Sequence, residues 1–425
     1  MKTIQINHIA KTEGHLSFVG ALIDNNFAQA RIETEEGARL IEGILLGRKY
    51  YEAPIITSRV CGVCPIVHNL TAIKALEQAL NIKVTPEIAM LRKMLLAAQW
   101  IHSHALHAFF LSFPDLIGIS NNFDFVQKFP SESRLALSVR EWGVELARVI
   151  GGRTVHPINS VVGGFNIEPD FSELSALIER TGEILKKAIA LFDFCRKQKL
   201  PRFVNPTNYI SLRTSGEYAV SGGKVHFSDN DEEKTENETL SLIEEMILPH
   251  ERVKRVKHFN QPIMVGALAR VNNNYHELNG QARKCWDKLR QKVPCYNSFY
   301  NTFAQATEIV HCVEEIQKLF KKYAALRVAV GFEKKLKVKF KPNPGRGVAA
   351  IEAPRGLLFH EYELDKSGNI LHCNIITPTA IFLANLENDL EKFLVENNKQ
   401  GEKKLKHLVR TLIRAYDPCV SCATH

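Results

Sequence analysis

Apolar and polar residues alternate along the first 35 positions of the chain, which is the pattern of β-strands. The runs TIQINHI, HLSFVGALI and FAQARIET each alternate, and glycine, aspartate and asparagine separate them. Turn-forming residues between alternating runs are typical of consecutive strands. We therefore expect residues 1–50 to form a β-rich N-terminal part.

Beyond this part, apolar residues recur at intervals of three and four, which favours amphipathic helices. Helices are expected over residues 70–79, 88–112, 131–150, 171–197, 235–247, 282–291, 303–323, 380–397 and 402–416. Strand-like runs return at residues 326–330, 336–340, 357–363 and 370–375. The pattern predicts a mostly α fold with small peripheral β-sheets.

Length and composition place these elements in one body. The chain has 425 residues, of which 45% are apolar, and it contains neither a proline- or glycine-rich linker nor an internal repeat. We expect a single interlocked domain over residues 1–425. The segment SDNDEEKTENET, residues 228–239, is polar and acidic enough to be a surface loop.

Charge and hydropathy argue against two classes of partner. The net charge is +9, but the basic residues are scattered or paired with acids, as in EKKLKVKFK, and no nucleic-acid-binding motif appears. No stretch offers about 18 uncharged apolar residues, and the N-terminus lacks an apolar targeting segment. We expect neither a nucleic-acid partner nor a membrane span in this chain.

The cysteines fall into two groups, and their odd number, nine, does not suit a disulfide framework. Four of them form two C-x-x-C pairs: Cys61 with Cys64 in RVCGVCPIVH, and Cys419 with Cys422 in DPCVSCATH. The other five are isolated and are expected to be buried small hydrophobes: Cys195, Cys285, Cys295, Cys312 and Cys373.

Two such pairs supply four thiolates, which suit zinc, an iron–sulfur cluster, or a nickel or iron centre. Zinc ribbons usually place their pairs about 15–20 residues apart, whereas Cys419 follows Cys64 by 355 positions. Closing that loop costs on the order of 5 kcal/mol, and metal binding can return roughly 10–16 kcal/mol. One site built from both ends is therefore accessible, and spacing alone leaves structural zinc, a redox metal and coincidence open.

The two cysteine segments resemble the paired signature of the [NiFe] hydrogenase large subunit, in particular its soluble cytoplasmic branch. Further segments resemble the same family in the same order: KTEGHLSF, GARLIEGILLGR, HSHALHAFFLSFPD, GGRTVHPINSVVGG, VGALARVN and EAPRGLLFH. The resemblance covers essentially the whole chain. It implies the mostly α large-subunit fold and the reaction H₂ ⇌ 2H⁺ + 2e⁻.

The resemblance also implies a Ni-Fe centre whose iron carries CN and CO ligands. Cys61 and Cys419 would be terminal ligands of nickel, while Cys64 and Cys422 would bridge nickel to iron. Metal coordination deprotonates thiols outright, so all four would be thiolates.

Proton handling and charge are assigned to five residues by the same resemblance. Cys419 would be the first base, and Glu13 would carry the proton onward. Arg355 would lie over the open metal position, where a pKa above about 12 makes it a poor base and suits it to orientation and electrostatics. Asp115 and Asp417 would be its carboxylate partners.

The remaining assignments concern the border of the cofactor and a second metal. Pro354 and His68 would border the Ni-Fe centre, with His68 bonded to a bridging sulfur. A buried Mg²⁺ ion would be bound by Glu42, His425 and a backbone carbonyl near Asn374. The segment ARLIE keeps Glu42 but lacks the glycine and aromatic residue that the family often has beside it.

The expected function is therefore the catalytic subunit of a [NiFe] hydrogenase in the cytoplasm. The resemblance implies an Fe-S small subunit, further electron-transfer subunits that use NAD(P) or flavin, a maturation protease, metal-insertion proteins and H₂ as partners. The alternatives are an H₂-sensing regulatory subunit with the same centre, and a structural zinc scaffold related to a complex I subunit.

Overall fold

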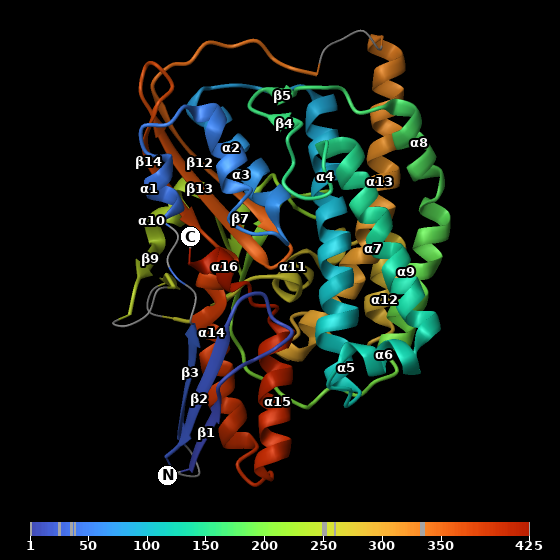
Figure 1. Cartoon of the computed structure of the whole chain (residues 1–425), viewed down its shortest axis with the longest axis vertical. Helices are drawn as coiled ribbons and strands as arrows, with labels where there is room; N and C mark the ends of the chain where they lie inside the picture. The colour runs from blue at the N-terminus through green and yellow to red at the C-terminus, as the bar shows by residue number, and fades with distance from the viewer. Residues whose placement is uncertain are drawn as a thin grey trace.

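The computed structural model describes residues 2–23, 27–34, 37, 40–248, 253–258, 261–331 and 336–424. Figure 1 shows long helices gathered on one side of the molecule and small sheets on the other. The blue N-terminal strands lie on the sheet side, where they run alongside red C-terminal helices. Among the described residues, no helix combines the length and apolar character needed to cross a membrane.

The helical side is built from four long helices that pack against one another: α4 (Pro86–Leu106), α7 (Pro130–Gly151), α9 (Thr181–Cys195) and α13 (Asn301–Val330). Pro86 occupies the first turn of α4, where its missing N–H costs nothing. Gly152 ends α7 in the left-handed conformation, with φ of 82°. Trp100 of α4 and Trp142 of α7 are almost completely buried between these helices.

A three-stranded antiparallel sheet forms the centre of the molecule: β12 (Gly345–Ala353), β13 (Gly356–Leu364) and β14 (Ile370–Ile376). Helix α3 (Pro65–Ala79) lies directly on β12. A Cβ atom at Gly347 would lie 2.1 Å from the carbonyl oxygen of Ala75, so only glycine allows this close approach. The sheet and α3 thus form one rigid support on which the first cysteine pair rests.

The N-terminal strands β1 (Lys2–Ile6), β2 (Leu16–Leu22) and β3 (Ala28–Thr34) form a second antiparallel sheet. The C-terminal helix α14 (Pro378–Glu396) packs on it, and α15 (Glu402–Ala415) contacts β1. The carboxylate of Glu387 in α14 accepts a 2.8 Å hydrogen bond from the backbone N–H of Ile32. This pairing brings the two ends of the chain together (Figure 1).

The other elements are shorter. A four-stranded sheet has the order β11-β6-β7-β8, with β6 (Asn208–Arg213), β7 (Lys224–Phe227), β8 (Glu232–Lys234) and β11 (Ile263–Met264). Two further pairs are β4 (Ser160–Val161) with β5 (Gly164–Phe165), and β9 (Ile243–Met246) with β10 (Arg255–His258). The remaining helices are α1 (Ile41–Leu45), α2 (Ala53–Thr57), α5 (Phe113–Leu116), α6 (Asn122–Lys128), α8 (Phe171–Glu179), α10 (Glu236–Leu242), α11 (Ala267–Asn274), α12 (Gly280–Asp287) and α16 (Val420–Ala423).

The expected fold class, mostly α with small sheets, is confirmed, and several element boundaries need correction. Residues 326–330 are the last turns of α13 and not a strand, because the helix continues through its apolar run. Residues 336–340 make only a single bridge, between Lys337 and Gly164. The helix expected over 171–197 divides into α8 and α9 at Arg180, and the one over 235–247 ends at Leu242, where β9 follows.

The segment 228–239 is mostly exposed, as expected, but it is not simply a loop. It contains β8 and begins α10, where the Thr235 side chain accepts a hydrogen bond from the backbone N–H of Glu238 and the Glu238 carboxylate bonds back to it. A reciprocal cap of this kind starts a helix even in a polar sequence.

Candidate metal centre

The first cysteine pair sits at the N-terminal end of α3. Cys64 precedes the helix, and Pro65 in its first turn fixes the entry. Gln99 of α4 holds the loop by two hydrogen bonds. Its amide donates to the carbonyl of Val63 at 2.7 Å and accepts from the backbone N–H of Ile66 at 3.1 Å. Cys61 accepts a hydrogen bond from the N–H of Val63 at 3.2 Å.

The second pair lies at the short helix α16: Cys419 directly precedes the helix and Cys422 is within it. Asp417 has a φ of 55°, a left-handed conformation that aspartate tolerates better than most residues, and it turns the chain out of α15. The backbone N–H of Cys419 then donates to the Thr379 hydroxyl at 3.1 Å, and the N–H of Val420 donates to the carbonyl of Glu13 at 2.9 Å. The second pair is therefore held by α14 and by the N-terminal segment.

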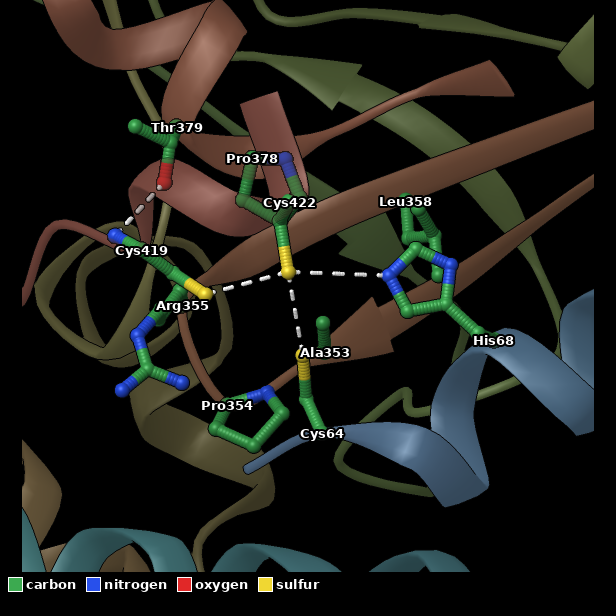
Figure 2. A pocket seen from close by; sticks show the side chains of 10 residues that line it. All are labelled: Cys64, His68, Ala353, Pro354, Arg355, Leu358, Pro378, Thr379, Cys419 and Cys422. Carbon is green, nitrogen blue, oxygen red and sulfur yellow. Dashed lines mark hydrogen bonds between the residues drawn. The ribbon is translucent and has the colours of Figure 1, made fainter. Parts of the chain in front are cut away.

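The four sulfur atoms meet in one buried cluster. Cys61 and Cys419 are 3.4 Å apart, Cys64 and Cys422 are 3.3 Å apart, and Cys419 and Cys422 are 3.1 Å apart. All four Sγ atoms lie within 4.8 Å of one another. Figure 2 shows three of the sulfurs converging between the His68 ring and the Arg355 guanidinium. The sulfurs thus form a ready set of soft metal ligands.

Burial makes this cluster unsuited to carrying negative charge without cations. Burial, and then hydrogen bonding with Cys422, hold the pKa of Cys419 well above its usual value. Hydrogen bonding with Cys419 instead holds the pKa of Cys61 well below its usual value. Four buried thiolates need positive charge close by, and metal ions supply it while deprotonating the thiols.

Arg355 lies beside the sulfurs in the turn between β12 and β13. Its Nε and Nη2 donate to Asp417 Oδ1 at 3.1 and 2.8 Å, and Nε also donates to the Asp417 carbonyl at 2.8 Å. Its Nη1 is buried and makes no hydrogen bond with any residue that the structure describes, while Arg355 and Pro354 line a small cavity together with Cys64, Cys419 and Cys422. A buried donor beside a cavity lined by three of the four sulfurs fits a bound metal group with acceptor ligands, so the residues present fit the expected centre.

The charge of Arg355 is permanent. Burial opposes ionisation, but Asp417 and the nearby sulfurs together raise the pKa of Arg355 well above its usual value. The guanidinium therefore supplies fixed positive charge and hydrogen-bond donors next to the sulfurs, and it cannot accept a proton.

A second arginine, Arg270 of α11, holds the turn between β12 and β13 by hydrogen bonds to its backbone carbonyls. Its Nη1 donates to the carbonyl of Ala353 at 2.8 Å and its Nη2 to that of Pro354 at 2.9 Å. It also pairs with Glu308 at 2.7 Å and Glu352 at 3.0 Å, and all three side chains are completely buried. Arg270 falls within the family-like segment VGALARVN and Glu352 begins EAPRGLLFH, but sequence order does not show that they meet Glu308, because the three residues come from distant elements.

Each carboxylate of the Arg270 cluster responds differently to burial. Burial raises the pKa of Glu352 to about 7. Burial also opposes ionisation of Glu308, but Arg270 outweighs it and lowers the pKa of Glu308 to about 2. At neutral pH Glu308 is therefore the firm counterion of Arg270.

Glu13 reaches the cluster from the N-terminal segment. Its carboxylate accepts a hydrogen bond from Cys419 Sγ at 3.1 Å, from the backbone N–H of Ser421 at 3.0 Å and from the Ser421 hydroxyl. The Glu13 side chain is only half-buried. It therefore connects a fully buried sulfur with the edge of the protein.

The position of Asp115 corrects one expectation. Its two oxygens bond the guanidinium of Arg414 and the ammonium of Lys11, the latter at 3.0 Å, so they pair with these cations and not with Arg355.

Asp417, the carboxylate that does pair with Arg355, is supported by Gln305. The amide of Gln305 donates to Asp417 at 3.0 Å, and Gln305 in turn contacts His107 at 2.6 Å. His107 falls within the family-like segment HSHALHAFFLSFPD, which was the available signal for it.

His68, which was expected at a sulfur of the centre, lies beside Cys422. His68 Nε2 lies 3.7 Å from Cys422 Sγ, and its Nδ1 lies 3.3 Å from His360 Nε2. His360 Nδ1 in turn contacts the Tyr362 hydroxyl at 2.9 Å. This chain of side chains fixes the orientation of the His68 ring.

The residues expected to bind magnesium are separated from this centre. Glu42 and Asn374 lie close together, and the ammonium of Lys254 is within 2.8 Å of Glu42 Oε1 and 3.3 Å of Asn374 Oδ1. His425 lies outside the described residues. The five isolated cysteines are all buried and free, as expected.

A mostly helical subunit with a buried four-cysteine site between its two ends defines the class of protein, and the comparisons identify the family. Residues 39–133 and 252–425 match the family described as nickel-dependent hydrogenase. These residues are more than half of the chain. The chain belongs to the nickel-dependent hydrogenase family.

Individual relatives extend this result over the full length. The chain is 31% identical to sulfhydrogenase 1 subunit alpha of Pyrococcus furiosus, over 99% of this chain and 97% of the relative. It is 25% identical to the beta subunit of the NAD-reducing hydrogenase HoxS of Cupriavidus necator, over 100% and 95%. The family argues against the structural zinc scaffold.

Solved structures share the fold. An NAD⁺-reducing [NiFe]-hydrogenase in the H₂-reduced state superposes with a TM-score of 0.89 at 26% identity, with both chains fully covered. The Ni-Fe-Se hydrogenase of Desulfomicrobium baculatum has a TM-score of 0.78 at 21% identity, again over both full chains, and at this identity it shows the fold alone. The chain is thus a large subunit of a nickel-dependent hydrogenase, with a Cys₄ site for metal.

Replacing Arg270 with methionine is expected to destabilise the protein by about 3–5 kcal/mol, because it leaves Glu308 charged and unpaired in the core. Thermal unfolding followed by circular dichroism measures the effect. The matched control is Arg213→Met, which removes a surface arginine paired with the exposed Asp231 and should leave the transition nearly unchanged. Equal effects of the two substitutions would contradict the role given to Arg270.

Proposed function

We propose that this subunit catalyses the reversible heterolytic cleavage of H₂ to protons and electrons at a Ni-Fe centre held by the four cysteines. The observation that carries the proposal is the set of four buried sulfurs within 4.8 Å, faced by an unpartnered arginine nitrogen. The family of the chain supports nickel as the metal.

Each cysteine has a role in holding the group. Cys61 and Cys419 are proposed as terminal ligands of nickel, and Cys64 and Cys422 as bridges to iron. When bound, the nickel and iron, with CN and CO on the iron, would supply the redox chemistry and the polarisation of H₂. Because the sulfurs are polarizable and shielded from water, they suit a metal pair that changes its charge during turnover.

The proton is proposed to leave through the N-terminal segment. The sulfur of Cys419 accepts the proton, since it already makes a 3.1 Å hydrogen bond to the Glu13 carboxylate. Glu13 takes the proton from the sulfur and passes it toward solvent, because its side chain is half-buried. Two hydrogen bonds from Ser421 hold the carboxylate in position for this transfer.

Arg355 is proposed to act by charge and orientation. Asp417 holds the Nε–Nη2 edge of its guanidinium, and Nη1 has no hydrogen-bond partner among the described residues where Arg355 lines the cavity. A fixed donor in a dry cavity stabilises negative charge without reorganisation. Pro354 closes the same cavity, which keeps water from the reacting atoms.

The electrons are proposed to leave through an Fe-S small subunit. The four paired cysteines are committed to one centre, and the other five are buried singly, so a path through clusters requires another polypeptide. The name of the NAD-reducing hydrogenase relative supports NAD as an electron acceptor. Further electron-transfer subunits that use NAD(P) or flavin, and the cytoplasm as the compartment, are proposed from the family resemblance. A maturation protease and metal-insertion proteins would complete the assembly.

The purified complex is expected to contain nickel and iron and to show infrared bands in the range of metal-bound CO and CN. Cys419→Ser should lose nickel and these bands, since oxygen is a poorer ligand for this metal than sulfur. Cys195→Ala, at another buried cysteine, is the control and should keep both. A Cys419→Ser protein with full metal content and H₂ turnover would refute the centre, and intact bands with very slow wild-type turnover would favour a sensor.

Glu13→Gln should slow H/D exchange by about 10²-fold or more, because the amide keeps the acceptor for Ser421 but cannot carry the proton. Nickel and iron content and the infrared bands should remain. Mass spectrometry of the H₂, HD and D₂ produced gives the rate. Glu33→Gln, on the exposed side of β3, is the control, and an unchanged exchange rate in Glu13→Gln would remove Glu13 from the proton path.

Arg355→Lys should lower H₂ oxidation by roughly 10²-fold, the size expected for loss of one preorganised donor. The ammonium keeps the charge but cannot bond Asp417 and the cavity together, so metal content should stay and the infrared bands should shift slightly. The control is Arg346→Lys on β12, the strand that precedes the turn of Arg355, where the arginine is largely exposed. Full activity of Arg355→Lys would contradict this role.

A further inference from the structure

A cluster of oxygen atoms lies where three elements meet at the edge of the central sheet. Glu42 is in α1, Glu245 is in β9 and Asn374 is in β14. Lys254, directly before β10, places its ammonium among them. Its Nζ lies 2.8 and 3.0 Å from the two oxygens of Glu42, 3.3 Å from Asn374 Oδ1 and 3.5 Å from Glu245 Oε1.

The surrounding groups are fixed independently of Lys254. The backbone N–H of Ile375 donates to Glu42 Oε1 at 2.7 Å, and the amide of Asn374 donates to Glu245 Oε2 at 2.8 Å. Lys254, Glu42 and Glu245 are 21, 22 and 24% exposed, so the cluster is mostly shielded from water. Two carboxylates and an amide oxygen therefore converge on one point, and an ammonium group occupies it.

This arrangement does not fit a magnesium ion at the same place. Carboxylate and carbonyl oxygens are what Mg²⁺ prefers, but the ion demands near-ideal octahedral geometry. The Lys254 ammonium contacts both oxygens of Glu42, the carboxylate that the family resemblance assigns to magnesium. A divalent cation on that carboxylate would lie against a positive charge and would have to displace it.

We propose that the ammonium of Lys254 takes the place of a divalent cation at Glu42, so that this chain joins α1, β9 and β14 without magnesium. The Lys254 side chain provides a positive charge to the two carboxylates. Because this charge belongs to the chain itself, it is in place as soon as the protein folds, without a bound ion. Removing the ammonium leaves an oxygen-lined site with two negative charges, which has the composition of a hard-metal site. The inference is independent of the proposed hydrogen chemistry, because nickel and iron are measured separately.

The test uses the assembled enzyme, dialysed against EDTA and analysed by mass spectrometry for magnesium, nickel and iron. The wild type is expected to hold nickel and iron and no stoichiometric magnesium. Lys254→Ala is expected to take up manganese in an electron paramagnetic resonance titration, and Mn²⁺ should raise its Tm by about 2 °C or more. Lys254→Arg keeps the positive charge and should take up none.

The matched control is Lys74→Ala, which removes a lysine of similar exposure, 23%, that bonds Glu236 at 2.9 Å and the carbonyl of Ala350. This variant loses an ion pair but leaves no second carboxylate, so Mn²⁺ should not change its Tm. Lys254→Ala without manganese uptake would overturn the inference. One magnesium ion per wild-type chain that is lost in Glu42→Gln would also overturn it, even if Lys254→Ala does not fold.

Discussion

Four buried sulfur atoms must be held in contact although they come from the two ends of the chain, and most of the architecture follows from this constraint. Covalent connectivity cannot provide it. The contact depends on Glu13, whose carbonyl binds the N–H of Val420 and whose carboxylate binds Cys419 and Ser421. The N-terminal sheet packs on α14, and α14 supplies Thr379 to the backbone of Cys419. The same residues that join the ends therefore surround the sulfur proposed as the first base, so the fold and the proton path share their contacts.

The two arginines around the β12–β13 turn divide the work of positioning and chemistry. Arg270 satisfies both carbonyls of the turn and pairs with Glu308, so all its donors are used inside the protein. Arg355, in the same turn, is held by Asp417, and its Nη1 has no hydrogen-bond partner among the described residues. A buried unpaired donor is costly, and it persists because Arg270 and Asp417 fix the backbone and the guanidinium around it. The Nη1 group of Arg355 therefore lies beside the cavity, where it can donate a hydrogen bond to a bound ligand.

The sequence predicted the chemistry of the site better than its geometry. Spacing identified Cys61, Cys64, Cys419 and Cys422, and the family resemblance marked Glu13 and Arg355, because these residues lie in short recognisable segments. It assigned Asp115 to the wrong arginine, since sequence order carries no distances between segments. Lys254 has no local signal, and the family-like segment around Arg270 does not reveal its partners, because the partners of both residues lie far away in the chain. Residues 326–330 were read as a strand from their apolar run, but α13 continues through them, although Val328 is exposed. Strand β12 was missed because GRGVAAIEA is rich in small residues, which its close contact with α3 requires.

Charge balance explains why metal belongs at the sulfurs and not at Glu42. Asp115 has Arg414 and Lys11, Asp417 has Arg355, and Glu42 has Lys254, so each of these carboxylates meets a cation of the chain itself. The four sulfurs face a single guanidinium, and that guanidinium is already paired with Asp417. Four thiolates beside one neutralised arginine would leave a large uncompensated charge in the core. At the sulfurs, the thiolate charge needs cations from outside the chain, whereas at Glu42 the ammonium of Lys254 already supplies a positive charge from the chain itself.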